Sequence, residues 1–138
     1  PGINPMQFKE ITEEQIKSAE RTSADQGYAY LVKNLKGIGV DHYIVKVSSN
    51  TCTYVGQFGE ELVLTHPLPE RDPTETFDLE GIKTAIRLSE EGTIDYPTFL
   101  DQIALAGIHT YVADLNQMAV IYQGPNSEYE YVQTIQEV

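Results

Sequence analysis

Apolar residues recur at helical spacing in two segments of each half of the chain. In the first half they are three or four positions apart over residues 11–19 and again over residues 28–38. The same spacing returns in the second half over residues 79–86 and 95–106. A stripe of this kind marks one face of an amphipathic helix. The pattern therefore predicts four helices, two in each half.

Polar and glycine residues at the ends of these segments support the four helices. Thr12, with Gln15 three positions later, matches a capping box, and Pro97 falls in a first turn, where a missing N–H costs nothing. A glycine followed by an apolar residue is typical of a left-handed helix stop. The expected N-caps are Thr12, Asp78 and Asp95, and the expected stops are Gly39, Gly92 and Gly107.

Each helix pair is followed by segments with the alternation of a half-buried strand. Residues 43–47 and 111–115 alternate, and each meets a short polar loop before a second apolar run. This pattern predicts a β-hairpin in each half. Further turns at 56–59 and 124–127 lead into segments 61–64 and 128–135.

The two halves also match each other in sequence. A shift of 68 residues aligns residues 27–62 with 95–130, and upstream the shift becomes 66. The identities include Tyr28 with Tyr96, Gly39 with Gly107, Tyr43 with Tyr111, Tyr54 with Tyr122, Gly56 with Gly124 and Glu60 with Glu128. We interpret residues 1–138 as a single domain of two repeats, residues 8–64 and 77–135. Three prolines make residues 65–76 an extended connector.

This organisation predicts an α+β fold with internal duplication of a helix-helix-β-hairpin unit. Because helices and half-exposed hairpins must both bury an apolar face, we expect helices to cover one face of an antiparallel sheet. Two copies in one chain then resemble a fused homodimer with a pseudo-twofold axis. Strand order stays open at this point.

Composition and charge restrict the class of protein. The chain has 138 residues, 41% of them apolar, and one cysteine, which cannot form an internal disulfide. It has no run of about 20 apolar residues and no signal-peptide pattern, so we expect a soluble, cytoplasmic protein with no membrane partner. The net charge of −12 argues against direct binding to nucleic-acid phosphates.

The negative charge is concentrated in the second half. Residues 1–68 carry six basic and eight acidic side chains, whereas residues 69–138 carry three and thirteen. Two interpretations stay open. The acidic stretch is a solvated, solubilising face, or it mimics a polyanion and docks a basic protein partner.

Few residues offer catalytic or metal-binding chemistry. No cysteine pair, helical histidine pair, calcium-type loop or phosphate-binding glycine loop is present, so we predict no metal and no cofactor. Cys52 lies in an apolar strand without a basic neighbour, which favours an inert buried thiol. His42 and His109 fall on opposite strand faces and need not converge.

Tyrosine is the enriched residue, with nine in the chain. By strand parity, Tyr43, Tyr54, Tyr111 and Tyr122 fall on the inner faces of the two hairpins. They are either core rings or the lining of a pocket at the repeat interface, whose polar contacts come from phenol hydroxyls. His109 shares the face of Tyr111 and is either a hydrogen-bonded histidine or a ligand or base. These five are the candidate ligand-binding residues.

Four segments carry a family resemblance: residues 96–99, 106–108, 111–115 and 121–124. They resemble the YbcV-like family of small bacterial proteins, grouped as domain-of-unknown-function family 1398 and often labelled phage-envelope-protein-like. The resemblance spans the chain from about Met6, so residues 1–5 are interpreted as preceding the natural start. It implies no catalytic residues, because its motifs are glycines and aromatics.

These observations leave three hypotheses for function. The first is a non-enzymatic binding or regulatory module, alone or as a homodimer. The second is a small enzyme with acid–base chemistry on Tyr111, Tyr122 and His109 at the repeat interface, which would need these groups within hydrogen-bond reach. The third is an acidic polyanion mimic or phage-related protein.

Overall fold

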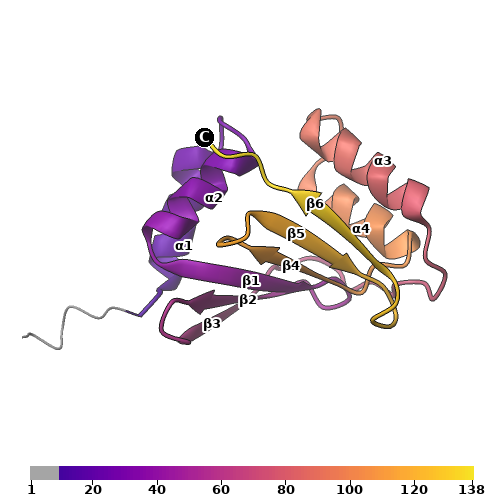
Figure 1. Ribbon diagram of the computed structural model, residues 1–138, viewed down its shortest axis with the longest axis horizontal. Helices are drawn as coiled ribbons and strands as arrows, with labels where there is room; N and C mark the ends of the chain where they lie inside the picture. Colours follow the sequence, from indigo (N-terminus) through magenta and orange to yellow (C-terminus); the bar gives the residue numbers. More distant parts are fainter. Residues whose placement is uncertain (1–9) are drawn as a thin grey trace, which may run out of the picture.

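The computed structural model describes residues 10–138 and has an α+β fold of four helices and one six-stranded antiparallel sheet (Figure 1). The start of the first repeat at residue 8 and the interpretation of residues 1–5 lie outside the described residues. The strand order is β3-β2-β1-β4-β5-β6. The first-half elements are α1 (Glu13–Ser23), α2 (Tyr28–Gly37), β1 (Val40–Lys46), β2 (Thr51–Gly56) and β3 (Glu61–Thr65). The second-half elements are α3 (Leu79–Glu90), α4 (Tyr96–Leu105), β4 (Thr110–Asp114), β5 (Ala119–Gln123) and β6 (Glu130–Thr134).

The starts of the helices and the three glycine stops agree with the sequence prediction. Thr12 and Gln15 form the reciprocal capping box of α1, and the Asp78 carboxylate accepts from the backbone N–H of Gly81 at the start of α3. Gly39 and Gly107 follow α2 and α4 with φ of 96° and 92°. A positive φ is easy only for glycine, so the helix ends there. No helix within residues 10–138 has the length and apolar character needed to cross a membrane.

Strand pairing is symmetric about the middle of the sheet. Ile44 of β1 pairs with Val112 of β4, the residue 68 positions later in the chain. The hairpins keep the same offset, because Tyr43 pairs with Tyr54 and Tyr111 pairs with Tyr122. This register agrees with the expected helix-helix-hairpin pattern in each half.

Each half continues beyond the hairpin into a third strand, and there the offset changes. Leu62 pairs with Tyr54, while Tyr131 pairs with Tyr122. The offset becomes 69 because the turn before β6 has one additional residue: Gly56 N–H donates to Glu60 O, and Gly124 N–H donates to Tyr129 O. The expected match of Glu60 with Glu128 is therefore wrong by one residue.

The helices cover one face of the sheet and form the core with it. Alternate strand residues are buried, among them Tyr43, Val45, Tyr111 and Ala113, and they pack against buried helix residues such as Leu100. Figure 1 shows α1 and α2 over one end of the strands and α3 and α4 over the other. The core thus lies between the sheet and two separate helix pairs.

The opposite face of the sheet carries no helix in the described part of the chain. A cross-strand row runs over all six strands on this face, with Ile44 and Val112 at its centre and Val63 and Val132 at its ends. The two outer valines are 56% and 50% exposed. This face is therefore open, as half-solvated antiparallel sheets commonly are.

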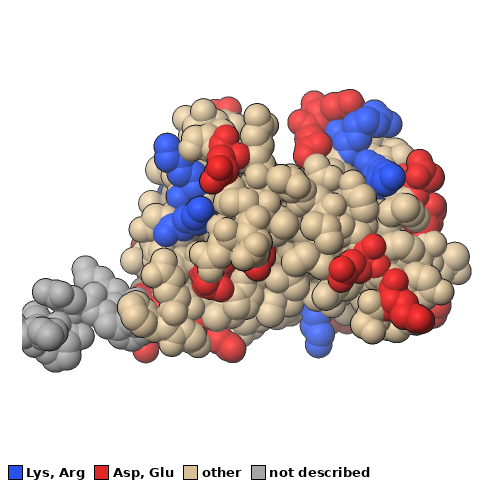
Figure 2. Space-filling model, in the orientation of Figure 1, with Lys and Arg blue, Asp and Glu red and all other residues tan. Residues whose placement is uncertain are grey.

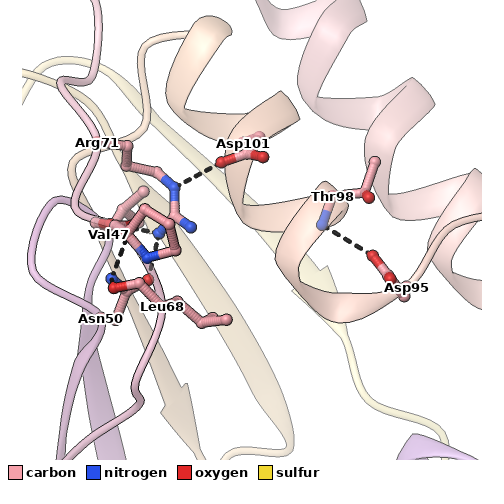
Figure 3. A network of polar contacts seen from close by, with 8 residues as sticks. Val47, Asn50, Leu68, Arg71, Asp95, Thr98 and Asp101 are labelled. Atoms are coloured by element: carbon pink, nitrogen blue, oxygen red, sulfur yellow. Dashed lines mark hydrogen bonds and ion pairs between the residues drawn. The ribbon is translucent and has the colours of Figure 1, made fainter.

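The connector between the halves is held by a polar network around the buried Asn50 (Figure 3). Arg71 donates to Asp101 on α4 at 2.8 Å, to Val47 O at 2.8 Å and to Asn50 Oδ1 at 2.5 Å. The Asn50 amide donates in turn to the carbonyls of Leu68 and Pro69, both at 3.1 Å. Residues 66–76 of the connector contain no helix or strand, and they join the β1–β2 turn to the second helix pair.

Candidate functional site

A cleft of about 610 Å³ lies between the two helix pairs above the second half of the sheet. Residues 26–30 at the start of α2 form one wall, and Ile86, Ser89 and Glu90 of α3 form the other. Residues 133–136 and Val138 of the C-terminal segment complete the lining. In Figure 2 the two helix pairs stand apart as two lobes with a notch between them.

Aromatic rings dominate the inside of this cleft. Tyr111 and Tyr122 form the floor on β4 and β5, with ring centroids 5.5 Å apart. Phe99 of α4 meets Tyr122 edge-on at 6.3 Å. The aromatic lining residues are Tyr28, Tyr30, Tyr96, Phe99, Tyr111 and Tyr122.

The floor continues into the first half of the sheet. The ring centroids of Tyr43 and Tyr111 lie 6.4 Å apart across the central strand pair, and those of Tyr43 and Tyr54 lie 5.4 Å apart. The four rings are each 6% exposed. The structure thus brings four of the five predicted site residues into one row, of which Tyr111 and Tyr122 reach the cleft.

Two hydroxyl pairs join the helices to this row. The hydroxyl oxygens of Tyr28 and Tyr43 are 2.5 Å apart, and those of Tyr96 and Tyr111 are 2.7 Å apart. In each pair one O–H donates to the other oxygen, which leaves the second O–H proton available to another acceptor. Tyr28 and Tyr96 are 68 residues apart at equivalent places in the two halves. That match, together with their position at helix starts, is the sequence signal that could have placed them in the site.

Burial keeps these phenols protonated. It raises the pKa of Tyr43 and Tyr111 well above 10, and neighbouring tyrosines add to the effect. Burial also raises the pKa of Tyr96 to about 12, although the hydrogen bond with Tyr111 opposes it. For Tyr122, burial is the first cause of the raised pKa, and Tyr28 and the Glu90 carboxylate add to it. At neutral pH the cleft therefore presents hydroxyl groups rather than phenolates.

His109 is placed elsewhere. Its Nε2 lies 3.0 Å from Thr74 O in the connector, and it is absent from the residues that line the cleft within the described chain. His42 lies 2.7 Å from the Asp41 carboxylate through Nδ1. The structure thus does not bring His109 together with Tyr111 and Tyr122 around the cleft, since His109 contacts Thr74, which bonds to Ala104 O at the end of α4.

The C-terminal segment is another part of the site that sequence reasoning missed. After β6, Ile135 N–H donates to Met118 O at 2.8 Å, and residues 133–136 form part of the cleft wall. At the equivalent position of the first half, His66 N–H donates to Asn50 O at 3.0 Å. The chain then continues into the connector. The ring centroids of His66 and Tyr96 lie 6.0 Å apart.

Other reactive groups are few in the part of the chain that the structure describes. No three His, Cys, Asp or Glu side chains among residues 10–138 gather in a way that could hold a metal ion. Burial raises the pKa of the Cys52 thiol to about 12, so the thiol stays protonated and unreactive at neutral pH.

A comparison with protein families identifies the family of the chain. A family model described as "Protein of unknown function (DUF1398)" matches residues 15–132. The chain belongs to this family. Among curated proteins, none matches the chain. The part matched to the DUF1398 family spans both helix pairs, the connector and the tyrosine row, whereas residues 133–138 of the cleft wall follow it.

Proposed function

We propose that the chain is a non-enzymatic binding module and that the cleft between its helix pairs holds a small organic ligand. The observation that carries the proposal is the cleft of about 610 Å³ with six aromatic side chains on its lining. Ligand sites in proteins are commonly clefts of roughly 300–1,000 Å³ with mainly apolar walls and a few polar groups.

The paired hydroxyls supply those polar groups. Because the Tyr96–Tyr111 pair needs only one of its two protons, the pair can donate the other to a ligand acceptor, and its oxygen lone pairs can accept from a ligand N–H or O–H. The phenols are held by packing in the sheet and by each other, so they are oriented before a ligand arrives. Preorganised polar groups in an apolar wall favour selective binding.

The same features favour binding over acid–base catalysis. A catalytic acid or base works best when its pKa is near the operating pH. Burial moves the pKa of Tyr111 and of Tyr122 upward, away from neutrality. His109, the remaining candidate base, contacts Thr74 of the connector.

Charge placement gives less support to a polyanion mimic. Figure 2 shows acidic side chains in separate places on the face in view, with Lys and Arg between several of them. A cytoplasmic location and the YbcV-like, phage-envelope-like labels of the sequence resemblance remain part of this proposal. The proposed ligand site does not depend on either of them.

The proposal is tested by a thermal-shift screen of a metabolite library against the wild-type chain. A ligand at ten times its Kd adds about 1.4 kcal/mol to the free energy of unfolding. For a domain of this size that raises Tm by roughly 3–5 °C. We expect at least one compound class to give such a shift.

Two matched variants locate the binding. Ser89→Trp places a large ring on the cleft wall, whereas Ser18→Trp places the same ring on the exposed surface of α1. We expect Ser89→Trp to remove the shift and Ser18→Trp to keep it. Hits that bind both variants as tightly as the wild type, or a library with no hits, would contradict the proposal.

A further inference from the structure

The cleft has an uneven charge. Among the described residues that line it, Glu90 is the charged side chain, and no Lys, Arg or His is present. The basic residues of the same helix are engaged elsewhere. Lys83 lies 5.8 Å from the centroid of the Tyr131 ring, and Arg87 pairs with Glu91 at 3.4 Å. The formal charge of the described lining side chains is therefore negative.

A guanidinium and a carboxylate outside the cleft lining act on Tyr96 with opposite signs. Burial is the first cause of the raised pKa of Tyr96; Arg71 of the connector lowers that pKa, and the Glu20 carboxylate on α1, a smaller cause, raises it. Glu90 contributes in the same direction to Tyr122. The charge that acts on Tyr96 is thus mixed, whereas the Glu90 carboxylate disfavours negative charge beside Tyr122, and the chain as a whole carries −12.

The aromatic lining favours positive charge for a different reason. The face of a phenol or phenyl ring carries the negative end of a quadrupole and attracts a cation within about 6 Å of its centroid. This cleft offers six such rings from both helix pairs and the sheet. Several of them pack edge-to-face or tilted rather than in one stack, including Phe99 with Tyr122 and Tyr111 with Tyr122.

We propose that the ligand of the cleft is an organic cation, a primary to quaternary amine with an apolar or aromatic body. This inference rests on the proposed function of the cleft as a binding site. The apolar body would lie among Ile86, Val120 and the rings, and the cationic head would lie toward Glu90. Anions and phosphate esters would meet no basic group among the described lining residues.

Three probes of one shape test the charge preference: phenethylamine as the cation, phenethyl alcohol as the neutral compound and hydrocinnamate as the anion. Their affinities are measured by NMR titration of the wild-type chain at low ionic strength. We expect the amine to bind roughly tenfold more tightly than the alcohol, because cation–π and carboxylate attraction act on the amine alone. The anion should be the weakest. Added salt should reduce the differences in affinity between the three probes, because it screens the charge interactions.

A charge-neutral variant identifies the carboxylate. Glu90→Gln should weaken amine binding roughly fivefold and leave the alcohol unchanged. The control is Glu80→Gln on the same helix, where the side chain is 85% exposed and outside the cleft lining. It should leave all three affinities unchanged.

The outcomes separate this inference from the proposed function. Equal binding of amine and alcohol, lost in Ser89→Trp, would overturn the cation preference and leave the cleft as a ligand site. Amine binding that survives Ser89→Trp would overturn both. If none of the three probes binds at millimolar concentration, the organic-cation assignment is wrong, and the library screen alone decides the function of the cleft.

Discussion

Gly39 and Gly107 show how one backbone conformation can have two different surroundings. They end α2 and α4 with φ of 96° and 92°. A Cβ on Gly39 would meet nothing within 4 Å, whereas a Cβ on Gly107 would overlap Thr76 O and lie 3.0 Å from Phe77 Cα. The connector approaches the second helix stop at its backbone, so glycine is needed there for conformation and for space.

We predict different costs for the same substitution at the two positions. Gly39→Ala carries the penalty of a left-handed alanine alone, about 1 kcal/mol of unfolding free energy. Gly107→Ala must also displace connector backbone, so about 3 kcal/mol or more is expected. Urea unfolding followed by circular dichroism measures both values. Equal losses of unfolding free energy in the two variants would show that the connector backbone can move away from position 107 without an energetic cost.

At the scale of elements, the connector acts as part of the core rather than as a tether. Arg71 is 10% exposed and bonds to three groups from the β1–β2 hairpin and α4. Asn50, with φ of 59° and 1% exposure, holds the connector carbonyls. The network in Figure 3 therefore fixes the second helix pair relative to the first hairpin.

Removing the guanidinium should be costly. Arg71→Leu leaves the buried Asn50 Oδ1 without its donor, and we expect a loss of about 2–4 kcal/mol in unfolding free energy. The control is Arg87→Leu, since Arg87 is 59% exposed and pairs with Glu91 on the helix surface. It should cost no more than about 0.5 kcal/mol. Comparable losses in the two variants would contradict a structural role for the connector network.

The sequence predicts the elements better than the contacts between distant ones. Local signals suffice for caps and strand parity, so the start of α1 at Thr12 and the inward position of Tyr43 are predicted correctly. The additional residue in the turn before β6 could not be predicted, because a turn tolerates an insertion without any change in the hydrophobic pattern of the strands. Arg71 and the C-terminal wall depend on where a connector and a tail pass in space. Tyr28 and Tyr96 reach the site only because helices are laid over the sheet.

At the scale of the whole molecule, buried hydroxyls make stability depend on alkaline pH. Nine tyrosines are present, and four of them form the row of buried rings at 6% exposure. Burial is the first cause of the raised pKa of each of these four, Tyr43, Tyr54, Tyr111 and Tyr122. In the unfolded chain a tyrosine has a pKa of about 10. The folded state therefore binds these protons more tightly than the unfolded state.

The free energy of unfolding should be independent of these groups below about pH 9 and should fall as pH rises through 10, because the unfolded chain loses its protons first. Each buried phenol then removes about 1.4 kcal/mol per pH unit, and four remove roughly 6 kcal/mol by pH 11. A domain stabilised by 5–15 kcal/mol should therefore unfold between about pH 10 and 12.

Tyrosinate absorbance and circular dichroism, followed together, test this: the buried rings should ionise only as ellipticity is lost. Tyr54→Phe removes one of the four groups, so its stability should fall less steeply with pH above 10 than that of the wild type. Complete tyrosinate absorbance near pH 10 in a chain with native ellipticity would mean that the row is open to solvent, and the cleft floor would then lack the dry, neutral hydroxyls on which its proposed selectivity depends.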